Sequence, residues 1–198
     1  MTIRWTDRGL NGGRDASPIL AFMTDIRLAD NLSVLNQLPA GAWVILRFLP
    51  GRPFPLDPRT AARLCKERHL KLLVAKDHRL AERIGADGLH LPEAQLRQAC
   101  LSPALSWLRA KPGRLLSISA HSERALLRAA KFSPDAILCS PVFATASHPE
   151  AKPLGSLRFA RLCRLTKRPV IALGGIRRAT ALRLAFTKAA GFAGTSFM

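Results

Sequence analysis

Two glycine-containing segments near the end of the sequence have the composition of a phosphate-binding site. They read LGGI at positions 173–176 and GTS at positions 194–196. Because glycine has no side chain, backbone amides beside it can approach an anion closely. A tight turn into a helix is the other common use of a Gly-Gly pair. The candidate phosphate-binding residues in these segments are Gly174, Gly175, Thr195 and Ser196.

Eight short apolar runs are the expected strands of this chain. Amphipathic stretches separate them, which is the pattern of repeated strand–helix units with a buried parallel sheet. The LGGI segment follows the seventh run, and GTS lies near the C-terminal end of the eighth. The expected strands are Ile19–Thr24, Trp43–Leu49, Leu70–Ala75, Gly88–Leu91, Leu115–Ser119, Ala136–Phe143, Pro169–Leu173 and Phe192–Phe197.

The helices predicted between these strands complete a barrel pattern. Apolar spacing predicts helices over 57–67, 94–110, 122–131, 156–165 and 179–189, and a short connection over 77–84. Ser122 and Thr180 are typical cap-region residues. The alternation predicts an α/β fold, a compact (β/α)₈ TIM barrel over residues 18–198 that lacks the last helix, after an N-terminal arm over 1–17. Such barrels usually hold phosphate in the loops after strands seven and eight, where the glycine segments stand.

The composition indicates one globular domain with a large excess of positive charge. The 198 residues include 31 Lys and Arg against 13 Asp and Glu, a formal net charge of +18. Nucleic acid is a possible partner for such a charge. However, the basic residues are spread along the chain, tyrosine is absent, and Phe and Trp lie mainly in apolar runs, so stacking platforms for bases are not evident. We expect phosphorylated metabolites as partners and solvated helix faces as the reason for most of the charge.

Cysteine usage indicates a reducing compartment, and hydropathy indicates neither a membrane span nor a secretory signal. Cys65, Cys100, Cys139 and Cys163 match neither a metal motif nor a dense disulfide framework, so reduced, mostly buried thiols and no zinc site are expected. The sequence has no run of 18 uncharged apolar residues, and its first residues lack the apolar core of a secretory signal. We therefore predict no membrane insertion and a cytoplasmic location.

Five segments resemble the thiamine-phosphate synthase and thiazole tautomerase family in order and approximate spacing. They are LAFMTD, GADGLHL, SISAHS, CSPVFATASHP and RPVIALGGI, and the resemblance covers roughly residues 18–198. GADGLHL and PVIALGGI also resemble phrases of other phosphate-binding barrels. PVFATASHP is more specific, because it is similar to the family's Pro-[Val/Ile]-Phe-x-Thr-x-Thr-Lys loop after strand six.

The resemblance implies that this loop holds the phosphate of a thiazole substrate. Thr145 and Ser147 stand where the family has two threonines, and His148 stands in place of the lysine. Capping of the loop backbone is the alternative role of the two hydroxyl groups. Ser119 and His121 match the family's Ser-Ala-His, whose serine lies near the pyrophosphate of a pyrimidine substrate. For His121 alone a structural role is the expectation.

On the pyrophosphate side the sequence departs from the family. Arg47 remains from the family's strand-two Gln-Leu-Arg, and an ordinary strand-end ion pair is its alternative role. The residues AKD at 75–77 replace Asn-Asp-Arg after strand three, and Glu93 is the nearest substitute for a missing aspartate after strand four. The resemblance implies catalytic roles for Arg47, Lys76 and Ser119, and a Mg²⁺ ion held by Asp77 and Glu93.

The reaction that the resemblance implies is a transfer in thiamine biosynthesis. The family joins an aminopyrimidine methyl pyrophosphate to a thiazole phosphate, and magnesium-bound pyrophosphate departs. The replaced carboxylates leave a second hypothesis open, a catalytically weakened relative that binds thiazole or thiamine phosphate. A tautomerase is not favoured, because Pro141 stands at the position of its catalytic histidine. A polyanion-binding protein is the third hypothesis, and a homodimer that covers the open side of the barrel is expected.

Overall fold

Eight parallel strands close into a barrel in chain order, and β1 pairs with both β2 and β8. This closed barrel confirms the predicted TIM barrel. The computed structural model describes residues 18–28, 30–48, 51–97, 102–145 and 150–195. The strands are β1 Ile19–Met23, β2 Trp43–Leu46, β3 Lys71–Ala75, β4 Gly88–Leu91, β5 Leu115–Ala120, β6 Ala136–Cys139, β7 Val170–Leu173 and β8 Gly191–Gly194.

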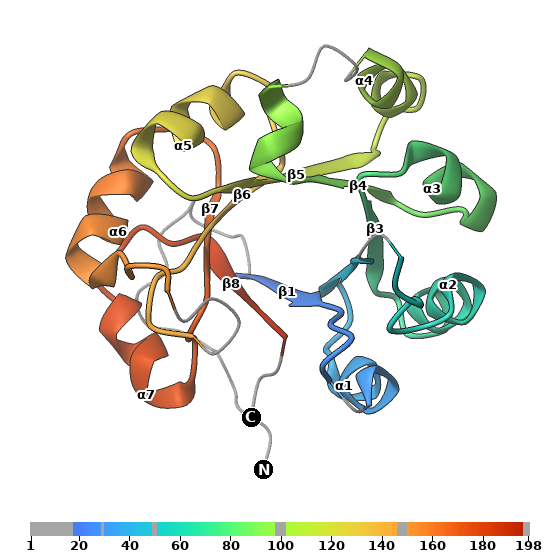
Figure 1. Cartoon of the computed structure of the whole chain (residues 1–198), viewed down its shortest axis with the longest axis horizontal. Helices are drawn as coiled ribbons and strands as arrows, with labels where there is room; N and C mark the ends of the chain where they lie inside the picture. Colours follow the sequence, from blue (N-terminus) through green and yellow to red (C-terminus); the bar gives the residue numbers. More distant parts are fainter. Residues whose placement is uncertain (1–17, 29, 49–50, 98–101, 146–149, 196–198) are drawn as a thin grey trace.

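Helices surround the strands on the outside, as Figure 1 shows. Aspartate or serine side chains cap several of them. Asp57 accepts from the amide of Thr60 before α2, and Ser122 accepts from that of Ala125 before α5, which satisfies amides left open in the first turn. The helices are α1 Asn31–Gln37, α2 Pro58–Glu67, α3 His78–Ile84, α4 Ser102–Arg109, α5 Glu123–Ala130, α6 Gly155–Arg164 and α7 Arg178–Ala181, with 3₁₀ turns η1 Glu93–Arg97 and η3 Leu182–Leu184.

Several predicted boundaries are wrong. The expected strands at 43–49 and 136–143 end early, at Leu46 and Cys139, because apolar residues continue into the loops after β2 and β6. The expected helix over 94–110 is a 3₁₀ turn followed by α4, and the one over 179–189 ends at Ala181 and continues as η3. Helix α1 was not predicted. In the described part of the chain no helix follows β8.

Alternate strand positions supply two different cores, since successive side chains in a strand face opposite sides. Phe22, Val44 and Val74 pack in the layer between the strands and the helices. A second, smaller cluster comes from the alternate positions of the strands and fills the barrel interior. It contains Ala21, Met23, Trp43, Ile45, Leu73, Ala136, Leu138, Ile171 and Ala193.

Three of the four cysteines lie in the described part of the chain, and all three are buried thiols. Cys65, Cys139 and Cys163 are free and buried, and burial raises the pKa of each thiol to about 12. Cys100 and the N-terminal arm lie outside the described residues. None of the described helices has the length and apolar content to cross a membrane.

Closure of the barrel depends on a glycine at the start of β8. Gly191 pairs with Ile19, and a Cβ atom built on it would overlap the backbone oxygen of Ile19. We expect Gly191→Ala to lower the free energy of unfolding by about 1–3 kcal/mol through overpacking. Gly113→Ala is the control, because its added methyl meets nothing within 4 Å and costs only backbone strain. Equal losses for both variants in urea unfolding would contradict this view of the closure.

Candidate functional site

A cavity of about 270 Å³ lies at the C-terminal ends of the strands. In a parallel barrel these ends meet on one rim, so side chains from distant parts of the sequence gather there. A larger hollow of about 560 Å³ lies at the opposite end, between α2 and α3, away from the predicted site residues. The rim cavity is lined by Met23, Arg47, His121, Ser140, Pro141, Ala144, Thr145, Ala151, Leu173, Gly174, Gly175, Ile176, Arg177, Ala193, Gly194 and Thr195.

One side of this cavity is formed by backbone from the loops after β6 and β7. The carbonyls of Leu173 and Gly174 accept hydrogen bonds from the amides of Val142 (2.9 Å) and Phe143 (3.0 Å). Within the described residues, the amides of Gly174, Gly175 and Ile176 donate to no protein acceptor. Consecutive amides without an acceptor, at the edge of a cavity, suit an anion.

Glycine is required at both positions of this turn. Gly174 and Gly175 have φ values of +91° and +65°, which L side chains rarely adopt. A Cβ atom on Gly175 would also overlap the carbonyl oxygen of Ala144 in the neighbouring loop. The Gly-Gly pair therefore makes a tight turn and also lines the cavity, while its phosphate-binding role stays a prediction.

Basic side chains also line the cavity. They are Arg47, directly after β2, His121 and Arg177, and the described lining residues include no Asp or Glu. The carboxylate of buried Asp25 pairs with Arg47, with its Oδ2 3.0 Å from Nη2 of Arg47. A hydrogen bond from the Arg27 side chain, together with the charges of Arg47 and Arg27, holds the pKa of Asp25 below its ordinary value despite burial. The cavity thus pairs amides on one side with a guanidinium on the other.

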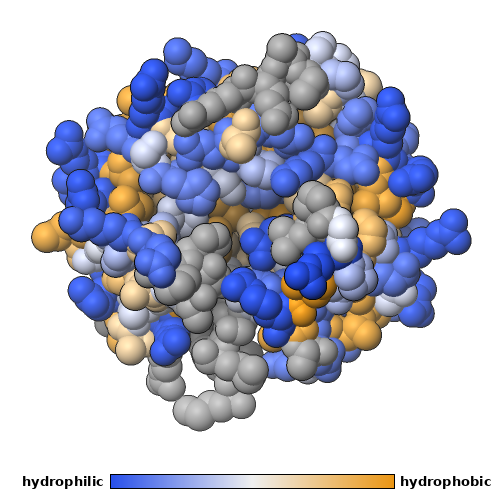
Figure 2. All heavy atoms as spheres, in the orientation of Figure 1, coloured by the Kyte–Doolittle hydropathy of each residue, from blue (hydrophilic) through white to orange (hydrophobic). Residues whose placement is uncertain are grey.

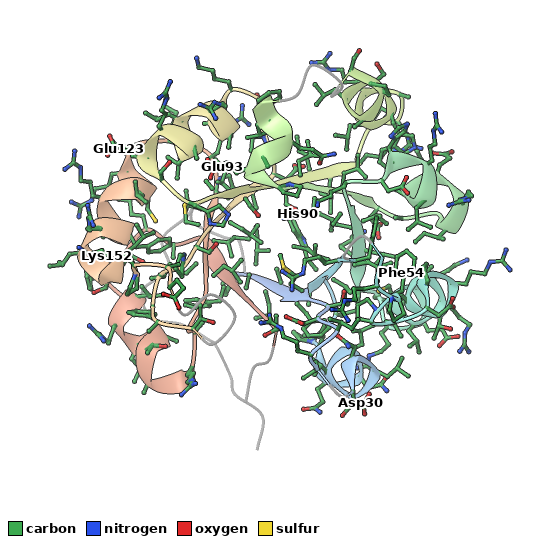
Figure 3. All side chains as sticks on the ribbon, in the orientation of Figure 1. Asp30, Phe54, His90, Glu93, Glu123 and Lys152 are labelled. Carbon is green, nitrogen blue, oxygen red and sulfur yellow. The ribbon has the colours of Figure 1, made fainter. Side chains whose placement is uncertain are left out.

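A short polar chain crosses the barrel interior beside the cavity. His90 of β4 lies between two serines of β5, with Nδ1 2.9 Å from Oγ of Ser117 and Nε2 2.9 Å from Oγ of Ser119. Figure 3 shows His90 in the middle of the ring of strands. Burial, with smaller contributions from Arg47, His121 and Lys76, lowers its pKa to about 3. His90 is therefore neutral near pH 7, and Ser119 has a fixed partner.

The three remaining candidates lie near the cavity but do not line it. Lys76 is exposed, has a positive φ of 69°, and donates its amide to the carbonyl of His90. Asp77 caps α3, with Oδ1 2.9 Å from the amide of Leu80. Oε2 of Glu93 accepts from the amide of His121 at 3.0 Å. No group of three or more His, Cys, Asp and Glu capable of holding a metal occurs in the described chain, so these carboxylates do not form a ready-made magnesium site.

The rim brings together the predicted residues of both halves of the site. Arg47, Thr145, Gly174, Gly175 and Thr195 line one cavity. Ser147, His148 and Ser196 lie outside the described residues. Sequence reasoning did not select Asp25, His90 or Arg177. The segments LAFMTD and GADGLHL contain the first two, so a charged or titratable residue within an apolar strand was the available signal.

Comparison with known proteins supplies the family. The model of the family described as thiamine monophosphate synthase matches residues 32–198, which is most of the chain. The chain belongs to the thiamine monophosphate synthase family. A protein of Geobacter sulfurreducens is 31% identical over 189 residues, which are 95% of this chain and 81% of that protein.

Other members match over shorter segments. A protein of Aquifex aeolicus is 35% identical over 113 residues, and thiamine-phosphate synthase of Lysinibacillus sphaericus is 29% identical over 130 residues. These segments cover 57% and 65% of this chain, and the chain spans 58% of the length of each of these relatives. Thiamine phosphate pyrophosphorylase from Pyrococcus furiosus has the same fold, with a TM-score of 0.69 and 22% identity over 88% of this chain and 84% of that one.

The depressed pKa of His90 predicts a pH dependence of stability. Between its ordinary value of 6.5 and about 3, the unfolded chain binds a proton on this imidazole that the folded chain does not. The free energy of unfolding should therefore fall with decreasing pH in that window, by up to ~1.4 kcal/mol per pH unit from this group. Chemical unfolding of His90→Gln should show a shallower slope there, whatever its stability at pH 7. An unchanged slope would refute a buried neutral imidazole.

Proposed function

We propose that this chain is a thiamine-phosphate synthase, a transferase that joins an aminopyrimidine methyl pyrophosphate to a thiazole phosphate. The observation that carries the proposal is one cavity with two anion-binding sides. Free amides and Thr145 line the side formed by the loops after β6 to β8, and Arg47 lines the side formed by β2. A substrate pair that carries a monophosphate and a pyrophosphate requires two such groups in one cavity.

The thiazole phosphate belongs, in this proposal, on the amide side. The amides of Gly174 and Gly175, the hydroxyl of Thr145 and the backbone at Thr195 would bind its oxygens, since phosphate dianions favour such donors. Arg177 adds a positive charge to the same part of the rim. Ser147, His148 and Ser196 remain predicted members of this half of the site.

The pyrophosphate belongs on the side of Arg47. In the proposed reaction the bond between the pyrimidine methylene carbon and a pyrophosphate oxygen breaks, and the electron pair leaves with pyrophosphate. The thiazole nitrogen then gives its lone pair to that carbon, and a C–N bond forms. This chemistry requires neutralisation of the departing charge more than proton transfer. Arg47 and Lys76 are the cations proposed for that role.

A neutral His90 suits the departure of pyrophosphate. A positive charge develops on the pyrimidine methylene carbon as the pyrophosphate departs, and a protonated imidazole nearby would oppose it. Because burial keeps His90 unprotonated, the Ser117–His90–Ser119 chain adds hydrogen-bonding groups without charge. We propose that Ser119, oriented by His90, contacts the pyrimidine substrate.

Magnesium stays a prediction for this chain. The family chemistry calls for a cation on the pyrophosphate, and Mg²⁺ commonly binds one or two carboxylates together with substrate phosphate oxygens. Asp77 and Glu93 are the proposed carboxylates, but each already accepts a hydrogen bond from a backbone amide. Because both carboxylates already have these partners, the second candidate function is favoured. It is a relative that binds phosphorylated ligands without condensing them.

Formation of thiamine phosphate by the purified protein tests the proposal. With both substrates and magnesium, we expect product at a rate that depends on each substrate and falls at least tenfold in Arg47→Met, since that variant loses a charge placed at the leaving group. The product is measured by chromatography after oxidation to a fluorescent thiochrome. Binding of thiazole phosphate with no product at any magnesium concentration would overturn the synthase and leave the binding protein.

A glycine variant tests the amide side alone. Gly175→Ala should weaken binding of thiazole phosphate by about tenfold or more, because the added methyl displaces the turn against Ala144. Gly51→Ala is the matched control, since Gly51 also has a positive φ of +71° but lies in open space and does not line the cavity. Equal affinities for the two variants by calorimetry would remove the turn from the phosphate site.

Location and assembly are further parts of the proposal. Three buried, unpaired thiols are compatible with a reducing compartment, which supports a cytoplasmic location. On the face that Figure 2 shows, hydrophilic residues are spread around the outline of the molecule. We propose small phosphorylated metabolites as partners, because the basic residues are spread along the chain and do not form one tail. A homodimer remains a prediction.

A further inference from the structure

The first two residues after β1 hold Arg47 at two points. Oγ1 of Thr24 accepts from the backbone amide of Arg47 at 2.9 Å, directly after β2. Oδ2 of Asp25 accepts from Nη2 of the Arg47 side chain at 3.0 Å. Adjacent residues therefore fix both the backbone and the guanidinium of the arginine that lines the cavity.

The carboxylate of Asp25 is shared with a second arginine. Oδ1 accepts from the backbone amide and Nε of Arg27, both at 2.9 Å, and Oδ2 lies 2.5 Å from its Nη2. The Asp25 side chain is 4% exposed, against 28% for Arg47 and 52% for Arg27. One buried negative charge between two guanidiniums leaves this cluster with one net positive charge at the rim.

Asp25 is itself held by Asn31, the first residue of α1. Oδ1 of Asn31 accepts from the amide of Asp25 at 3.1 Å, and its Nδ2 donates to the carbonyls of Asp25 (3.0 Å) and Leu28 (3.3 Å). Nδ2 also lies within bonding distance of the carbonyl of Pro55 in the loop after β2. Asn31 is 4% exposed, so a buried amide joins the loops after β1 and β2 around the carboxylate.

We propose that Asp25 is a positioning residue that holds Arg47 in the orientation that receives a pyrophosphate group. An arginine fixed before the anion arrives loses less side-chain entropy on binding than one that is free to rotate. The family match begins at residue 32, so Asp25 lies outside the matched segment. This inference rests on the proposed function, since it assigns the anion that Arg47 meets.

A purely structural ion pair would have a different signature. If Asp25 only stabilised the fold, its loss would lower stability and weaken anion binding to the same degree whether or not Arg47 is present. If Asp25 acts through Arg47, its loss should matter for pyrophosphate only while the guanidinium is there. A double-mutant cycle separates these cases.

The experiment measures inorganic pyrophosphate binding by calorimetry, with and without magnesium chloride. The proteins are wild type, Asp25→Asn, Arg47→Met and the double variant. We expect Asp25→Asn to weaken binding by about tenfold in the wild-type background and by less than about twofold in the Arg47→Met background. Asp30→Asn is the control, because Asp30 only caps α1 through the amide of Ser33 and should leave affinity unchanged.

Each result decides the inference independently of catalysis. Equal losses in both backgrounds, or wild-type affinity in Asp25→Asn, would overturn it, as would absence of pyrophosphate binding by the wild type. Thermal unfolding of Asp25→Asn shows whether the variant is folded under the assay conditions. If it is not, Asp25→Glu replaces it, since the longer side chain keeps the charge and displaces the guanidinium. Failure to form thiamine phosphate while the cycle gives the expected coupling would sink the synthase and keep the positioning role.

Discussion

The contact between the loops after β6 and β7 is the constraint on which the candidate site depends. Two backbone hydrogen bonds, from Val142 to Leu173 and from Phe143 to Gly174, hold the loops so close that the turn can pass only with glycine at 174 and 175. The carbonyls of Leu173 and Gly174 accept these two hydrogen bonds. The amides of Gly174 and Gly175 donate to no acceptor among the described residues, so they remain for a ligand. The same geometry that satisfies the turn therefore leaves donors for the proposed anion, which is why the two expectations for this glycine pair do not exclude one another.

The other half of the cavity is built from side chains, not from backbone amides. The carboxylate of Asp25 is buried at a cost that Arg27 and Arg47 offset, while the Asn31 side chain bonds the backbone of Asp25, and the result is a guanidinium fixed at the rim. Beside it, burial keeps His90 neutral. The proposed site for two phosphorylated substrates thus has amides on one side and a fixed cation on the other, with the uncharged Ser117–His90–Ser119 chain in the barrel interior.

The parts of this account that the sequence predicts are those with local signals. Apolar runs predict all eight strands, and the LGGI segment predicts the turn after β7. In both cases the signal lies in the residue type at single positions, apolar where a side chain is buried and glycine where φ is positive. Boundaries failed where apolar residues continue past a strand, as at Val142 and Phe143. The contacts of Asp25 and His90 depend on strand pairing, which places His90 opposite Ser117, and no local pattern encodes that register. Helix α1 has no predicted counterpart, because NLSVLNQ is only seven residues long and its clearest signal is the single cap Asp30.

A crystal structure of the protein with pyrophosphate and thiazole phosphate tests the central claim most directly, that one rim cavity binds both anions. The account predicts the monophosphate within hydrogen-bonding distance of the amides of Gly174 and Gly175, and the pyrophosphate against the guanidinium of Arg47. Both anions should occupy the same molecule. Anions bound only by arginines on the outer helices, with the loops after β6 and β7 unchanged and without ligand, would contradict it.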